Sequence, residues 1–163
     1  MGLTWSSLNH SATPENQASV ITEQKTVLVV GDSISAAFGL DQANGWVQII
    51  ANKFQNKLTM VNTSISGDTT TGGRYRLPKA LDAHEPDLVI IELGGNDGLR
   101  GTPIPMIKAN LAAMIQASKN QGADVLLMGM KIPPNYGERY TQLFEMMYQE
   151  LAEEYGTLFI PFF

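Results

Sequence analysis

The chain has 163 residues, 44% of them hydrophobic and 17% charged, with a formal net charge of −5. This length fits a single domain that buries a core without covalent staples. The absence of cysteine excludes disulfides, thiolate metal sites and cysteine nucleophiles. The acidic balance argues against a nucleic-acid partner, because no basic patch can neutralise phosphates. No apolar run reaches the ~18 residues of a membrane span, so we expect no integral membrane segment.

The start of the chain is polar and rich in Ser, Thr, Asn and Gln. It shows neither the basic start nor the apolar stretch of a secretory signal, so no signal peptide is visible in it. We interpret residues 1–24 as a flexible polar leader and residues 25–163 as one folded domain.

Short apolar runs alternate with helical patterns after this leader. Near-continuous runs of Val, Ile and Leu are typical of strands that are buried on both faces of a parallel sheet. The sequence therefore predicts an α/β protein, a three-layer αβα sandwich with a five-stranded parallel sheet. The predicted strands are 26–30, 58–62, 87–93, 124–130 and 157–163.

Three helical patterns lie between these runs. Asn44 is the predicted N-cap of the first helix, Pro105 lies near the start of the second, and Gly156 closes the third. Segment 70–84 is predicted to be less regular, because two glycines and a proline interrupt it. The predicted buried stripes are Trp46, Ile49, Ile50 and Phe54 in the first, Ile107, Leu111, Met114 and Ile115 in the second, and Tyr140, Leu143, Met147, Leu151 and Tyr155 in the third.

Binding sites of open parallel sheets form beyond the carboxyl ends of the strands. The Gly-Asp-Ser turn after the first strand places Ser33 in the first turn of a following helix, as a nucleophile or as a mere cap. The second loop, 62–70, offers the N–H of Gly67, unless this glycine only serves a turn. The third loop, 93–101, offers the Asn96 amide, unless that amide bonds its own backbone. Together they favour acyl transfer, which needs a nucleophile and fixed donors around the attacked carbonyl oxygen.

Three motifs carry a family resemblance: GDSIS at 31–35, SISGDTT at 64–70 and ELGGNDGLRG at 92–101. They resemble the first three sequence blocks of the SGNH, or GDSL, hydrolases, whose fold is flavodoxin-like. The chain is most similar to the bacterial thioesterase I/lysophospholipase/arylesterase group. It also resembles this group at 132–140 and 161–163.

The resemblance implies a serine ester or thioester hydrolase that acts without a metal or cofactor, usually in the periplasm or outside the cell. It implies a nucleophilic Ser33 and an oxyanion hole made by the N–H groups of Ser33 and Gly67 and the side chain of Asn96. The loop 97–105 is then a flap over the acyl chain or an ordinary connector. The implied substrate contacts, for which a plain turn is the alternative, are Lys131, Ile132 and Pro133.

The base of this family is a histidine in a C-terminal Asp-x-x-His block, which this sequence does not contain. His10 lies in the leader, and His84 precedes the third strand. His84 is therefore about 20 Å from Ser33, at the opposite edge of the sheet. We expect this chain to hydrolyse esters little better than background. In the family another helix follows the block. Because it is missing here, we expect an exposed apolar sheet face that leads to self-association or binds a complementing C-terminal fragment.

Two other interpretations stay open at this point. The same donors could hold an acyl or anionic ligand in a non-catalytic binding module. A flavodoxin-like phosphate site at the start of the first helix is the weaker alternative, because no glycine-rich phosphate loop is present. The expected partner of the leading hypothesis is a small-molecule ester or thioester with an acyl chain.

Overall fold

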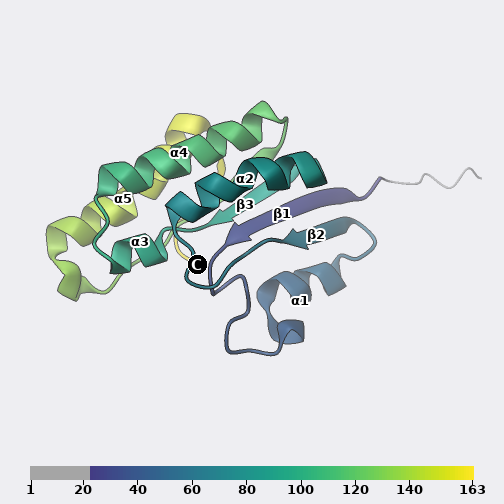
Figure 1. The fold of residues 1–163 in the computed structure, drawn as a ribbon, viewed down its shortest axis with the longest axis horizontal. Coiled ribbons are helices and arrows are strands. Elements are labelled where there is room, and N and C mark those ends of the chain that lie inside the picture. The colour runs from purple at the N-terminus through teal and green to yellow at the C-terminus, as the bar shows by residue number, and fades with distance from the viewer. Residues whose placement is uncertain (1–22) are drawn as a thin grey trace, which may run out of the picture.

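One parallel sheet of five strands forms the centre of the computed structural model, which describes residues 23–163 (Figure 1). The predicted leader, residues 1–24, lies outside the described residues except for its last two. The order of the strands is β2-β1-β3-β4-β5, as predicted for an α/β sandwich. The strands are β1 (Lys25–Gly31), β2 (Leu58–Asn62), β3 (Leu88–Glu92), β4 (Asp124–Met128) and β5 (Leu158–Ile160).

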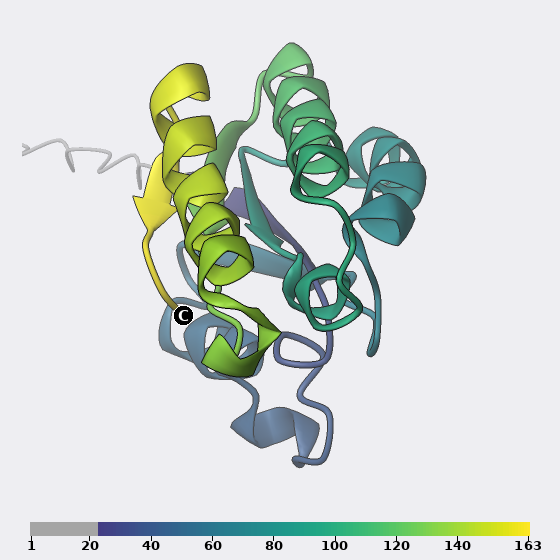
Figure 2. The same cartoon turned by 90° about the vertical axis from the view of Figure 1, so that its left-hand side faces the viewer.

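Three long helices cover one face of the sheet and one shorter helix lies on the other (Figure 2). The main core lies between the sheet and the three long helices, and Leu77, Leu111 and Phe144 are fully buried in it. The three-layer αβα arrangement is thereby confirmed. The three helices are α2 (Thr70–His84), α4 (Ile104–Asn120) and α5 (Glu138–Tyr155), and the single helix on the other face is α1 (Trp46–Lys53).

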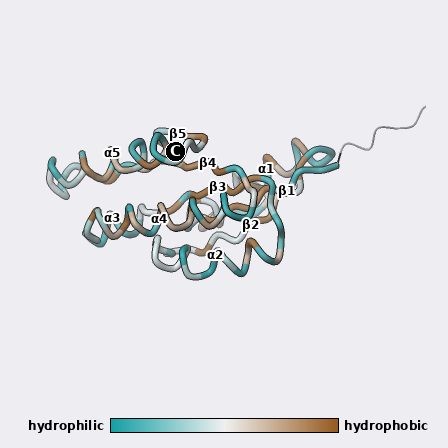
Figure 3. The backbone as a smooth tube through the Cα atoms, turned by 90° about the horizontal axis from the view of Figure 1, so that it is seen from above, coloured by the Kyte–Doolittle hydropathy of each residue, from teal (hydrophilic) through white to brown (hydrophobic). Residues whose placement is uncertain are grey.

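The two strands at the centre of the sheet are apolar along nearly their whole length. Residues 27–30 of β1 and 89–91 of β3 are almost completely buried. Seen from above, β3 and β4 are coloured as hydrophobic between the helix layers (Figure 3). Helices on both faces explain why these runs do not alternate with polar residues.

Helix α2 runs without a break through the segment that was predicted to be irregular, so that prediction is wrong. Leu77 and Leu81 on its inner face are buried in the main core. A Cβ at Gly73 would overlap with the side chain of Leu93, so this glycine lets the helix approach the sheet. The packing of these residues outweighs the low helix propensity of Pro78 and the glycines.

Helix α1 differs from its prediction in its cap and in its buried face. Gly45 is the N-cap instead of Asn44, which ends a short 3₁₀ turn (Gln42–Asn44). The buried residue of α1 is Val47, whereas Ile49 is 52% exposed. Val47 packs against the residues of β1 that face away from the main core, because this helix lies over the β1–β2 edge of the sheet.

Helix α4 buries the four residues that its pattern predicts, and α5 differs in part. Leu143 is exposed, and Phe144 and Tyr148 are the buried aromatic residues of α5. The two rings pack edge to face with centroids 5.5 Å apart. The buried stripe is therefore rotated by about one residue from the predicted one, although Met147 and Leu151 belong to both.

The α1 face of the sheet is apolar but poorly covered over β4 and β5. Leu126 and Ile160 are half-buried there, and Leu158 is 60% exposed. Within residues 23–163, α1 is the only helix on this face, and it lies over the opposite edge. No helix in the described part of the chain is long and apolar enough to cross a membrane.

Candidate active site

Ser33 lies in a series of turns beyond the carboxyl end of β1. The backbone N–H groups of Ala36 and Phe38 donate to the carbonyl oxygens of Asp32 and Ser33, each at 3.0 Å. The predicted helix starting at Ser33 is wrong, since the next α-helix begins at Trp46. Ala37 adopts a left-handed backbone conformation with a φ of 55°, which an α-helix does not accommodate.

Asp32 caps this turn instead of activating the serine. Its Oδ1 accepts the Ile34 N–H at 3.1 Å, and the Ser33 hydroxyl lies 3.5 Å from the same oxygen, at the limit of a hydrogen bond. Burial raises the pKa of the Asp32 carboxyl, while the hydrogen bonds from Ile34 and Ser33 lower it. The Ser33 hydroxyl is thus only weakly held.

Asn96 joins the three loops. It lies in a short helix, α3 (Gly95–Leu99). From the sequence, either a plain turn or a loop that presents a hydrogen-bond donor was possible here. Its Nδ2 donates to Asp32 Oδ2 at 3.1 Å and to the carbonyl oxygen of Asp68 at 2.9 Å. The amide therefore reaches the first and second loops and does not bond its own backbone. An oxyanion at this site would have to share or displace the contact with Asp32.

Gly67 follows β2 in a conformation that favours glycine. Its φ is 78°, and the space where a Cβ would lie is open. No acceptor within residues 23–163 takes its N–H, and Arg100 donates to its carbonyl oxygen at 3.3 Å. Its neighbour Asp68 contacts Asn96 directly, so the Gly67 loop adjoins the Asn96 side chain.

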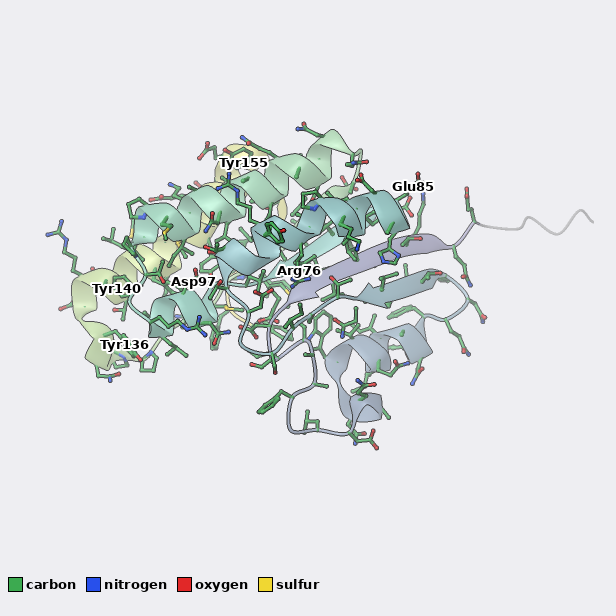
Figure 4. The ribbon with its side chains drawn as sticks, in the orientation of Figure 1. Arg76, Glu85, Asp97, Tyr136, Tyr140 and Tyr155 are labelled. Atoms are coloured by element: carbon green, nitrogen blue, oxygen red, sulfur yellow. The ribbon has the colours of Figure 1, made fainter. Side chains whose placement is uncertain are left out.

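Arg76 of α2 holds the second loop against the end of β1 (Figure 4). Its guanidinium donates to Asp68 Oδ2 at 2.8 Å, to the carbonyl oxygen of Thr63 at 2.6 Å and to that of Gly31 at 3.3 Å. The ion pair with Asp68 is mostly buried. Arg76 cannot be recognised from the sequence, because nothing near a single arginine in a helix indicates that it contacts the ends of two strands.

Asp97, the neighbour of Asn96, ties α3 to the start of α2 (Figure 4). Its carboxylate accepts the Thr70 N–H at 2.8 Å and the Thr70 hydroxyl at 2.7 Å. Asn110 of α4 donates to the same hydroxyl at 3.2 Å. Each oxygen of this buried carboxylate thus accepts one hydrogen bond from Thr70, which connects α3, and with it Asn96, to the start of α2.

A cavity of about 340 Å³ lies beside Ser33. Ser33 and Asn96 both line it, and so do all three predicted substrate contacts. Gly67 does not line it. Its walls are mostly apolar, and Lys131 bonds Glu145 at 3.1 Å, so its charge is partly neutralised. The lining residues are Asp32, Ser33, Ile34, Gly95, Asn96, Leu99, Met130, Lys131, Ile132, Pro133, Phe162 and Phe163.

His84 is the only histidine in the described part of the chain. It ends α2, is exposed, and precedes β3, so it lies at the amino edge of the sheet. Ser33 lies at the carboxyl edge, too far for a hydrogen bond. Within residues 23–163 no group of three or more His, Asp or Glu side chains could hold a metal ion. His10 lies outside the described residues.

The fold and these loops define an α/β protein with a serine turn at the carboxyl edge of a parallel sheet. A family model described as "GDSL-like Lipase/Acylhydrolase family" matches residues 29–163. The chain belongs to this family, as its motifs predict. The roles of the individual site residues stay predictions.

Among curated proteins, the chain is similar to esterase TesA of Pseudomonas aeruginosa. The two are 48% identical over 88% of this chain and 75% of TesA. It is 42% identical to thioesterase 1/protease 1/lysophospholipase L1 of Escherichia coli, over 85% of this chain and 66% of that protein.

Two crystal structures show the same fold. That of TesA has a TM-score of 0.81 and 49% identity, over 85% of this chain and 78% of the other. The second is the structure of the psychrotrophic esterase EstA from Pseudoalteromonas, inhibited by monoethylphosphonate. It has a TM-score of 0.82 and 40% identity, over 86% of this chain and 78% of EstA.

Proposed function

We propose that this chain is the scaffold of a serine ester or thioester hydrolase that forms an acyl-enzyme on Ser33. One observation carries this proposal: Ser33 and Asn96 line the same apolar cavity beyond the sheet. The names of the relatives, an esterase and a thioesterase/lysophospholipase, agree with it. So does the phosphonate-inhibited esterase of the same fold.

In this mechanism the Ser33 oxygen bonds to the carbonyl carbon of the ester or thioester while a general base takes the hydroxyl proton. The C–O or C–S bond of the substrate then breaks, the alcohol or thiol leaves with that proton, and the acyl group stays on Ser33 until water hydrolyses it. The negative charge on the carbonyl oxygen is stabilised by the N–H groups of Ser33 and Gly67 and by the amide of Asn96. One such donor is worth about 3–4 kcal/mol of the barrier. The acyl chain lies along the apolar part of the cavity, beside Leu99, Ile132 and Pro133.

We also propose that the 163-residue chain on its own is a poor catalyst, because no described histidine reaches Ser33. Loss of triad members lowers turnover by roughly 10⁴–10⁶. Asp32 does not replace the base, since its oxygens accept from Ile34 and Asn96.

Imidazole rescue tests both parts of this proposal. The purified chain should hydrolyse p-nitrophenyl butyrate at close to the buffer rate. Imidazole at about 0.1 M should raise the difference between the chain and its Ser33→Ala variant at least about tenfold, because it supplies the missing general base.

The Ser33→Ala variant is the control, since imidazole itself cleaves nitrophenyl esters. Equal rates of chain and variant at every imidazole concentration would refute Ser33 as the nucleophile. Rapid Ser33-dependent turnover without imidazole would refute only the impairment.

A non-catalytic module that binds acyl or anionic ligands is the second candidate. The distance of 3.5 Å between the Ser33 hydroxyl and Asp32 favours it, because within residues 23–163 no base is firmly bonded to this hydroxyl. Such a module would bind a fatty acid reversibly, with equal affinity in the Ser33→Ala variant, and would show no imidazole-dependent turnover.

The apolar face over β4 and β5 leads us to propose self-association of this chain or binding of a complementing C-terminal fragment. Light scattering after size-exclusion chromatography should show dimers or larger species at micromolar concentration. Leu158→Lys should shift them toward the monomer, because Leu158 is the most exposed apolar residue of β5. A stable monomer of the unchanged chain would contradict self-association. We further propose a periplasmic or extracellular location, which cell fractionation tests.

A further inference from the structure

A second buried carboxyl group lies behind the turn that carries Ser33. Glu92 is the last residue of β3 and has no exposed surface. Its Oε2 accepts the Ser35 hydroxyl at 2.6 Å and the N–H groups of Asp32 and Ser35, each at 3.3 Å. Asp32 precedes Ser33 and Ser35 follows it by two residues. One carboxylate oxygen therefore holds the turn on both sides of Ser33.

The turn is shaped around this carboxyl group. A Cβ at Gly31 would lie 2.6 Å from Glu92 Oε2 and 2.7 Å from the Ser35 side chain. Only glycine allows β1 to end this close to Glu92. The glycine of the GDSIS motif thus serves the contact between the turn and β3, and not only the flexibility of the loop.

The contacts of Ser35 extend this network to α1. Its hydroxyl, which is 1% exposed, accepts the indole Nε1–H of Trp46 at 3.2 Å. Its carbonyl oxygen accepts Asn62 Nδ2 at 2.7 Å. Trp46 is therefore connected to Glu92 through a single hydroxyl group, which makes its fluorescence a reporter of this carboxyl.

The other oxygen of Glu92, Oε1, is buried and has no hydrogen-bond partner within residues 23–163. Burial raises the pKa of Glu92 to about 7, and the nearby Asp32 carboxylate adds to this rise. Tyr148 of α5 is close enough to be affected: burial raises the pKa of its hydroxyl, and Glu92 adds to this rise. Arg76 donates to the carbonyl oxygen of Gly31, the residue that adjoins Glu92 Oε2. An unpartnered buried oxygen is a natural place for a proton.

We infer that Glu92 is a positioning residue for the nucleophile: its carboxylate fixes the turn so that the Ser33 hydroxyl and N–H face the cavity. The inference rests on the proposed function. Glu92 touches no substrate and acts only through Asp32 and Ser35. Ionised Glu92 makes charge-assisted hydrogen bonds to the turn, which are roughly twice as strong as neutral ones. The bonds to the turn are therefore stronger above pH 7 than below it, although ionisation of a buried carboxyl lowers the stability of the fold as a whole.

The experiment uses the 163-residue chain with Trp5→Phe, which leaves Trp46 as the only tryptophan. Imidazole is present throughout, because it supplies the general base that labelling of Ser33 needs. The rate of fluorophosphonate labelling at Ser33 and the emission of Trp46 are measured between pH 5 and 9, in this parent chain and in its Glu92→Gln variant. Glutamine keeps the shape and an acceptor oxygen but does not ionise. Glu153→Gln, at an exposed site on α5, is the control for a lost charge.

The labelling ratio of parent to Glu92→Gln should be about 1 below pH 6. It should rise to between about 5 and 100 above pH 8, in line with the cost of a misplaced reacting group. Trp46 emission should change with a midpoint near pH 7 in the parent and in Glu153→Gln, and not in Glu92→Gln. A merely structural glutamate would give a ratio that does not depend on pH.

The experiment distinguishes failure of the inference about Glu92 from failure of the proposed function. If the parent is labelled at Ser33 and Glu92→Gln is labelled at the same rate at every pH, the inference about Glu92 is refuted and the proposed function stands. If the Trp46 midpoint persists in Glu92→Gln, another group titrates and the inference is again refuted. If no variant is labelled at Ser33, the proposed function fails, and the inference fails with it.

Discussion

Replacing Asp97 by alanine tests whether this acidic residue of the ELGGNDG motif holds the site together. The carboxylate is 2% exposed and accepts two hydrogen bonds from Thr70 at the start of α2. Alanine leaves a buried N–H and a buried hydroxyl without this acceptor. Each unsatisfied buried group costs about 1–3 kcal/mol, so the free energy of unfolding should fall by about 3–5 kcal/mol. This is a large part of the 5–15 kcal/mol typical of a domain.

Urea unfolding followed by circular dichroism measures this loss as a shift of the midpoint. Asp97→Asn is the matched variant. Its amide oxygen still accepts the Thr70 N–H, but its NH₂ group faces the Thr70 hydroxyl, so about half of the loss is expected. Asp82→Ala, on the exposed side of α2, removes a surface contact to Gln121 and should change stability by less than about 0.5 kcal/mol.

An Asp97→Ala variant within about 1 kcal/mol of the parent would refute this energetic argument. A different result would refute the structural role itself. If Asp97→Asn kept full stability and lost all labelling at Ser33, Asp97 would belong to the reacting groups. We expect labelling to fall only in proportion to the displacement of Asn96.

Three further predictions concern the core and the buried carboxyl. Phe144→Ala, which removes a fully buried ring packed on Tyr148, should cost about 3–5 kcal/mol in thermal unfolding, and a loss below 1 kcal/mol would contradict the packing. Gly94→Ala should destabilise by about 2 kcal/mol or more, because Gly94 has a φ of 118° and a Cβ there would overlap with the Tyr148 hydroxyl. Adding Tyr148→Phe should recover part of this loss, and strict additivity would refute the overlap. Because the pKa of Glu92 rises from 4.5 to about 7 on folding, the folded state binds the extra proton. The free energy of unfolding should therefore fall by about 3 kcal/mol as the pH rises from 4.5 to 7, and Glu92→Gln should flatten this slope; an unchanged slope would contradict it.

The centre of the sheet could be predicted from the sequence because β1 and β3 are buried on both faces. Runs such as 27–30 and 88–91 have no polar residue that would blur the pattern. Helix α2 is more regular than predicted because its inner leucines, not its local propensity, decide its structure. The turn after Ser33 was missed for the opposite reason. Small residues there allow a helix, but the buried Glu92 holds the turn in another shape.

The candidate site could be predicted in part, because three of its loops carry compact motifs at neighbouring strand ends. Arg76 could not be found, since its three contacts lie 8, 13 and 45 residues away along the chain. Glu92 did leave a signal: it is the single carboxylate within the apolar run at 88–93, next to its end. A charged residue that ends a strand buried on both faces needs buried partners, and here Ser35 and the Asp32 N–H supply them.

Mass spectrometry after reaction with a fluorophosphonate in the presence of imidazole shows whether Ser33 is the nucleophile. We expect one adduct per chain, on the peptide that contains Ser33, and none in the Ser33→Ala variant. An adduct on another residue, or no adduct in a chain that binds a fatty acid reversibly, would contradict it.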